Sequence, residues 1–94
     1  MPEIKQDAGK AAELSVEADE AAAQGVYANL AGISHTETEF VFDFLFLQPH
    51  AAKARIRTRI ISSPVHAKRF HRALRENMKK YEDHFVPIPD RDKK

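Results

Sequence analysis

The chain contains no cysteine and no tryptophan, and only three of its 94 residues are glycine. Without cysteine, neither a disulfide nor a thiolate metal site can form. The scattered glycines also leave no glycine-rich loop of the kind that binds nucleotide phosphates. A chain of this length buries only about 60–65% of its unfolded surface, so its core is marginal on its own. Because disulfides are excluded, we expect oligomerisation to supply the missing stability.

Neither membrane insertion nor export is indicated. The longest apolar run falls far short of the ~20 residues that a membrane-spanning helix needs. The N-terminus lacks the basic and then apolar layout of a signal peptide. The formal net charge is +1, with most lysine and arginine in the second half of the chain. We therefore expect a cytoplasmic protein with no membrane partner.

The central feature of the sequence is residues 39–47, where phenylalanine occupies every second position from Phe40 to Phe46. Successive strand side chains point to opposite faces, so the rings would share one face, and aliphatic residues with Asp43 would share the other. Such a near-continuous apolar run is typical of a strand covered on both faces. The chain has one long candidate helix, which can cover only one face. We therefore expect a second copy to cover the other.

A first strand is predicted over residues 26–35, ahead of a polar turn at residues 36–38. A tight hairpin at that turn would set Ile33 opposite Val41. It would also place Gly32 beside the ring of Phe42, where a missing side chain makes room.

A third strand is predicted over residues 53–62. Pairing through a short loop would put Ile56 near Phe44 and Arg57 near Asp43, so that the apolar faces coincide. Asp43 and Arg57 would then form a structural ion pair across the strands.

Ser63 and Pro64 predict the start of a helix, because serine is a preferred N-cap residue and proline is preferred at the first helical position. Apolar side chains then recur at spacings of three and four, which is typical of an amphipathic helix. We expect this helix to pack on the phenylalanine side of the sheet. Its apolar stripe consists of Ala67, Phe70, Leu74, Met78, Tyr81 and Phe85.

The predicted fold is a single α+β domain over residues 13–89, with flexible tails over residues 1–12 and 90–94. Alternation in residues 13–18 favours a short fourth strand, although the alanines and glutamates there also favour helix. Residues 19–24 favour a helical turn that ends at Gly25. The domain would therefore be an antiparallel meander of three or four strands with one long C-terminal helix, completed or covered by dimerisation.

The amino-acid sequence resembles the bacterial domain-of-unknown-function family numbered 3467. The resemblance runs from about Leu14 to Pro89, and it implies a family but no activity. The order of a strand meander and one long helix also resembles the SecB export chaperone, in topology alone. The matching motifs are Gly25-Val26-Tyr27-Ala28-Asn29-Leu30, Ile33-Ser34-His35, Glu39-Phe40, Asp43-Phe44, Pro49, Arg59-Ile60-Ile61, Ser63-Pro64-Val65-His66-Ala67-Lys68-Arg69, Leu74, Asn77 and Lys80-Tyr81-Glu82.

No catalytic or metal-binding grouping is indicated. His66 and His71 are five residues apart, so they lack the spacing of a helical metal-ligand pair, and the other three histidines lie in separate segments. Ser34 and His35 would point to opposite faces of a strand, which argues against nucleophilic catalysis. We therefore expect no enzyme activity and no cofactor.

Basic side chains alternate along the third predicted strand and form the most distinctive candidate binding surface. We call these four residues, Lys53, Arg55, Arg57 and Arg59, the basic comb. The basic comb could follow a phosphate backbone, and basic residues of the helix could extend it. The comb could also protect an edge strand, or pair with acids at a subunit interface. The candidate binding residues are Lys53, Arg55, Arg57, Arg59, Lys68, Arg69 and Arg72.

The predicted function is that of a non-enzymatic binding or adaptor module that acts as a homodimer or higher oligomer. The alternatives are nucleic-acid binding through residues 53–59, with Tyr27 as the main ring for base stacking, and chaperone-like capture of unfolded chains. The predicted oligomer interface consists of Ile33, Val41, Leu45 and Leu47.

Overall fold

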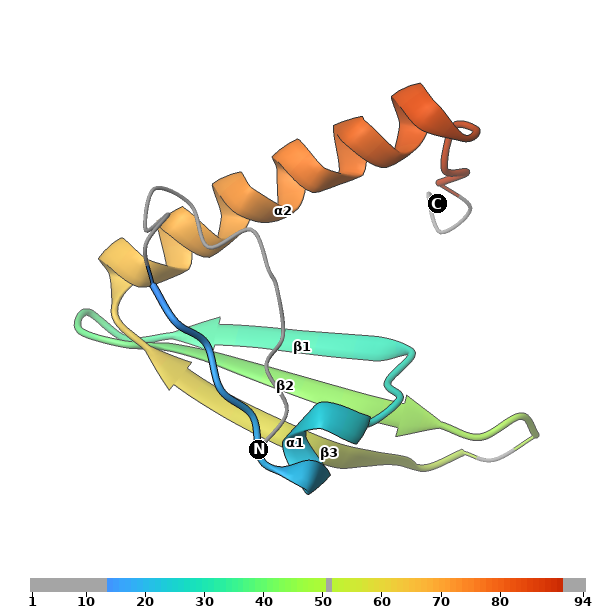
Figure 1. Cartoon of the computed structure of the whole chain (residues 1–94). Coiled ribbons are helices and arrows are strands. Elements are labelled where there is room, and N and C mark those ends of the chain that lie inside the picture. The colour runs from blue at the N-terminus through green and yellow to red at the C-terminus, as the bar shows by residue number, and fades with distance from the viewer. Residues whose placement is uncertain (1–13, 51, 91–94) are drawn as a thin grey trace.

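The computed structural model describes residues 14–50 and 52–90, so the predicted tail over residues 1–12 lies outside the described residues. Three antiparallel strands form one sheet in the order β1-β2-β3, and a long helix rises above one face (Figure 1). This confirms the predicted α+β meander with a C-terminal helix. The elements are α1 (Glu20–Gln24), β1 (Leu30–His35), β2 (Phe40–Leu47), β3 (Ala54–Ser62) and α2 (Pro64–His84).

The β1–β2 hairpin turns at the predicted polar tip. The backbone N–H of Thr36 donates to the carbonyl of Glu39 at 2.9 Å, and the Thr36 hydroxyl accepts from the N–H of Thr38 and of Glu39. The strands pair one residue away from the predicted register, with Ile33 opposite Phe42 instead of Val41. A shift of one residue reverses the face of every side chain. The prediction for Ile33 was therefore wrong, and this residue shares the face of the phenylalanine rings.

The same shift in register also corrects the prediction for Gly32. It lies opposite Asp43, away from the ring of Phe42, and a Cβ added to it would meet no atom within 4 Å. The predicted packing reason for this glycine is therefore wrong.

The β2–β3 pairing contains a β-bulge that the sequence did not indicate. Thr58 lies opposite Phe44, whereas the next pair along joins Leu45 to Ile56, so Arg57 is the extra residue. A bulge shifts the alternation of the strand that carries it. The predicted pairing of Ile56 with Phe44 was therefore wrong.

Helix α2 begins where the sequence predicted. Its N-cap is Ser63, whose hydroxyl accepts from the backbone N–H of His66 at 3.2 Å, and Pro64 occupies the first helical position. The last helical residue is His84. The helix therefore spans 21 residues and carries the predicted apolar stripe along its length.

The N-terminal segment is only partly as predicted. Asp19 caps α1 by accepting from the N–H of Ala22 at 2.8 Å, and Gly25 ends the helix with φ 75° and ψ 173°. That backbone conformation is essentially restricted to glycine. In place of the predicted fourth strand, the described residues 14–19 contain a single isolated bridge at Glu17.

The packed core is small and lies where α2 begins. Phe42 of β2 and Ala67 of α2 are the only buried hydrophobic residues in the described part of the chain, and each is 8% exposed. The ring of Phe70 meets that of Phe42 edge-on, with centroids 5.4 Å apart. Beyond these first turns α2 diverges from the sheet, and it makes no extensive contact with any strand (Figure 1).

Candidate functional site

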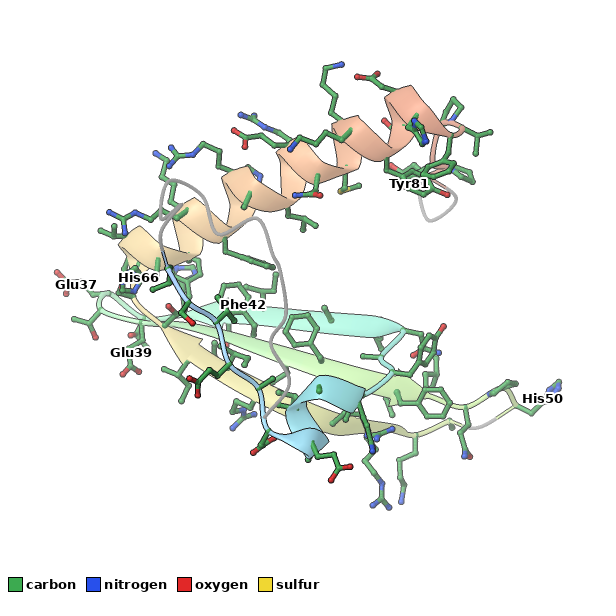
Figure 2. All side chains as sticks on the ribbon, viewed as in Figure 1. Glu37, Glu39, Phe42, His50, His66 and Tyr81 are labelled. Atoms are coloured by element: carbon green, nitrogen blue, oxygen red, sulfur yellow. The ribbon has the colours of Figure 1, made fainter. Side chains whose placement is uncertain are left out.

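The underside of α2 carries an apolar stripe that the chain itself leaves uncovered. Residues 74–84, which we call the far half of α2, continue the apolar stripe of Ala67 and Phe70 with the same spacing. Leu74, Met78 and Tyr81 are between 43% and 47% exposed. Figure 2 shows Tyr81 beneath the far end of the helix, well away from the strands, whereas Phe42 lies beneath its first turns. Within one chain the sheet therefore contacts only the near half of the stripe, while Tyr81 meets the ring of Phe85 with centroids 5.0 Å apart.

The sheet presents a matching apolar surface towards α2. We call this side the phenylalanine face, because it carries the four rings of β2. Ile33 of β1, Phe42 of β2 and Ile60 of β3 form one row across it. Ile33 is 62% exposed and Ile60 is 46% exposed. The helix therefore covers the middle of this row and leaves both flanks open.

The opposite side, which we call the back face, is also largely apolar. The predicted interface residues Val41, Leu45 and Leu47 lie here, paired with Ile61, Ile56 and Ala54 of β3. Ile61 is 58% exposed. The structure therefore places three of the four predicted interface residues on one face and moves Ile33 to the other.

An ion pair interrupts the back face. Arg59 donates to Asp43 through two nitrogen atoms, Nε at 2.6 Å and Nη2 at 3.0 Å. The hydrogen bond from Arg59 and its positive charge hold the pKa of Asp43 below its ordinary value, against the opposing effect of desolvation. The same contact raises the pKa of Arg59. The prediction of Arg57 as the partner of Asp43 was wrong, because Asp43 pairs with a residue two positions later in β3 than expected.

The bulge also breaks the predicted comb of basic residues. Arg59 remains on the back face with Asp43, whereas Arg55 lies opposite Phe46 on the other side. Three of the four comb residues gather near the β2–β3 turn around a pocket of about 480 Å³, which we call the basic pocket. Its lining residues are Phe46, Gln48, Lys53, Arg55 and Arg57.

An aromatic pair borders the basic pocket. The ring of Tyr27 meets that of Phe46 edge-on, with centroids 6.0 Å apart, and Tyr27 is 70% exposed. The sequence suggested Tyr27 as a stacking residue but assigned Phe46 to the core. The bulge that brings Arg55 and Arg57 to this ring has no signal in the sequence.

The basic residues of α2 do not extend this pocket. Lys68, Arg69 and Arg72 follow the end of β3, whereas the pocket lies at its beginning. Since a strand rises by about 3.3 Å per residue, the two groups are separated by roughly 25 Å along β3. Figure 2 shows His50 at the β2–β3 turn and His66 in the first turn of α2 at opposite ends of the sheet.

The histidines are dispersed. His35 stacks on Phe40 with centroids 5.3 Å apart, and His84 meets Phe85 edge-on at 4.5 Å. Across residues 14–50 and 52–90, no three histidine or acidic side chains come together as a metal ion would require. None of the described helices is both long and apolar enough to cross a membrane.

Comparisons with known proteins identify a family. No curated protein and no solved structure matches the chain, so the likeness to SecB stays a prediction about topology. A family model matches residues 1–90, which is nearly the whole sequence, and it is described as a protein of unknown function, DUF3467. The chain therefore belongs to the DUF3467 family, as its motifs indicated.

Proposed function

We propose that the protein is a non-enzymatic binding module that works as a homo-oligomer. The observation that carries this proposal is the uncovered apolar surface on α2 and on both faces of the sheet. Large hydrophobic side chains exposed in such numbers are unusual for a monomer, and a contiguous exposed patch marks an interaction site. Seventeen large hydrophobic residues are exposed in the described part of the chain.

The size of the exposed surface supports the same proposal. Phe42 and Ala67 are the only buried hydrophobic residues in the part of the chain that the structure describes, each 8% exposed. A folded chain of this length normally buries about 60–65% of its unfolded surface. A partner that covers part of this surface would restore an ordinary ratio of buried to exposed area.

Light scattering of the unmodified chain tests the proposal. We expect a mass at least twice the 10.7 kDa of one chain at micromolar concentration. A mass of one chain would overturn the homo-oligomer. If that monomer also suppressed aggregation of an unfolded client protein, capture of unfolded chains would explain the exposed surface instead.

Nucleic-acid binding at the basic pocket is a second candidate. Lys53, Arg55 and Arg57 line a pocket together with the ring of Phe46, and Tyr27 packs against that ring. Cations beside exposed rings suit a single strand, because the cations bind phosphates while the rings stack on bases. The pocket therefore favours single-stranded over double-stranded nucleic acid.

A salt titration with single-stranded DNA tests this second candidate. We expect Arg57→Gln to weaken binding and to reduce the slope of log affinity against log salt by about 1. Arg72→Gln is the matched control, because it removes the same charge from α2 at the other end of β3. Equal effects of the two variants would assign the binding to general charge, and no binding at low salt would dispose of the candidate.

A further inference from the structure

We propose that the far half of α2 lies on the phenylalanine face of a second copy of the chain, and that the second copy's helix lies on the first sheet in return. This inference rests on the proposed homo-oligomeric function and specifies its interface. Each subunit would contribute a helix to complete the core of the other.

The unused part of the stripe is the first step. Helix α2 is held to its own sheet through Ala67 and Phe70. The remaining four turns have the same apolar spacing but diverge from the strands and make no extensive contact with them. An amphipathic helix draws most of its stability from packing its apolar face. The regular continuation of the stripe through Leu74, Met78 and Tyr81 therefore indicates a second packing partner.

The receiving surface is the second step. Ile33 and Ile60 flank the buried Phe42 on the phenylalanine face, and both remain exposed beside the helix. Neither surface presents a charge at these positions, because the residues that would meet are Ile33 and Ile60 on one side and Leu74, Met78 and Tyr81 on the other. The same chain thus carries both an apolar ridge and an apolar surface to receive it, so a two-fold exchange satisfies both at once.

The back face is a poorer receiving surface for the stripe. The bidentate pair of Asp43 and Arg59 lies in its middle, with the carboxylate side chain 20% exposed. Covering this pair with an apolar helix would remove water from two charges without adding a hydrogen bond, which is unfavourable. The phenylalanine face contains no such pair among the described residues.

The area available agrees with a dimer of this kind. The two surfaces that would meet are open, since Ile33, Ile60, Leu74, Met78 and Tyr81 are each at least 43% exposed. Stable homodimers bury about 2,000–5,000 Å² in total, or half of that on each chain. Each chain would therefore need to bury about 1,000–2,500 Å², and the far half of α2 and the open flanks of the phenylalanine face would contribute to it.

Disulfide trapping tests the contact, because the natural chain has no cysteine that could interfere. Chains carrying Ile33→Cys with one tag are co-expressed with chains carrying Met78→Cys with another tag, and the purified protein is oxidised. Because random pairing leaves part of the protein in unmixed dimers, the mixed dimers are purified through both tags, and we expect most of these to be trapped by a disulfide bond. Glu76→Cys replaces Met78→Cys in the first control, because its side chain lies on the opposite side of α2 and should give little product.

The second control locates the receiving face. Ile61→Cys replaces Ile33→Cys, since Ile61 is similarly exposed but lies on the back face. Efficient trapping of Met78→Cys by Ile61→Cys, and not by Ile33→Cys, would overturn the proposed contact while leaving the homo-oligomer intact. A single-chain mass for the unmodified protein would overturn both proposals.

A measurement on the natural sequence covers the case in which a cysteine variant fails to fold. A mixture of isotope-labelled and unlabelled chains is dissociated and reassociated, and NMR contacts between copies are then selected. We expect contacts between the methyl groups of Met78 and Ile33. Contacts from Met78 to Ile61 alone would contradict the proposal.

Discussion

Asp43 places a carboxylate between aliphatic neighbours on the central strand, and it is held there by two hydrogen bonds from Arg59. Bidentate guanidinium–carboxylate contacts are stronger and more directional than single ones. Because the guanidinium is 56% exposed, solvent weakens the charge attraction between them. The pair therefore fixes the alignment of β2 on β3 more than it adds to overall stability.

The pKa of Asp43 tests which arginine is its partner. We expect an NMR titration to give a value below the ordinary ~3.9, and Arg59→Gln should raise it. Stability contributed by the pair is then fully present above the ordinary pKa, and it is lost as the pH falls through the lower folded-state pKa. Arg57→Gln should leave the pKa of Asp43 nearly unchanged. A larger rise with Arg57→Gln than with Arg59→Gln would contradict the observed pairing.

Two glycines are expected to respond oppositely to the same substitution. Gly25→Ala should lower the free energy of unfolding by about 1–3 kcal/mol, because alanine is strained at its backbone angles. Gly32→Ala should raise it by up to ~1 kcal/mol, because a Cβ meets no atom there and glycine weakens a strand. Urea denaturation at a fixed protein concentration measures both changes. Similar losses in the two variants would show that Gly32 approaches another surface.

At the scale of elements, Phe42 joins the sheet to the first turns of α2. Phe42→Ala should lower the free energy of unfolding by about 3–5 kcal/mol, because it empties the most buried ring site of the described chain. Val65→Ala is the control, since Val65 is 60% exposed on the outer side of the helix and should change stability by less than ~0.5 kcal/mol. Chemical denaturation of both variants makes the comparison. A loss below 1 kcal/mol for Phe42→Ala would mean that α2 is anchored elsewhere.

The sequence predicted elements better than it predicted their alignment. Ser63 and Pro64 favour a helix start through local capping chemistry, so the beginning of α2 could be predicted from the sequence. Register depends on how a turn closes, and neither the Thr36 hydroxyl bonds nor the bulge at Arg57 has a distinct sequence signal. An error of one residue therefore misplaced Ile33, and an error of two residues misassigned the partner of Asp43.

The two candidate surfaces were affected differently by these errors. The apolar stripe of α2 depends only on helical spacing, so its members from Ala67 to Tyr81 were predicted correctly, and Phe85 lies just past the end of the helix. The basic comb depends on an unbroken strand alternation, and the bulge divides it between two faces. The basic pocket with Phe46 could therefore not be derived from the sequence.

At the scale of the whole molecule, stability should depend on protein concentration. If the apolar stripe is covered by a second copy, unfolding is coupled to dissociation, and the midpoint of thermal unfolding rises with concentration. We expect this rise in the unmodified protein. Scanning calorimetry over a range of concentrations measures it, and a constant midpoint would indicate that each chain folds alone.

The central claim is that the far half of α2 is covered by another copy of the chain, and sedimentation of matched variants tests it most directly. The account predicts that the unmodified protein sediments at twice or more the 10.7 kDa of one chain, and that Met78→Glu reduces this to a single chain. Glu76→Lys, on the opposite side of the same helix, should leave the oligomer intact. An unmodified protein that sediments as one chain, or an oligomer that Met78→Glu does not disturb, would contradict the account.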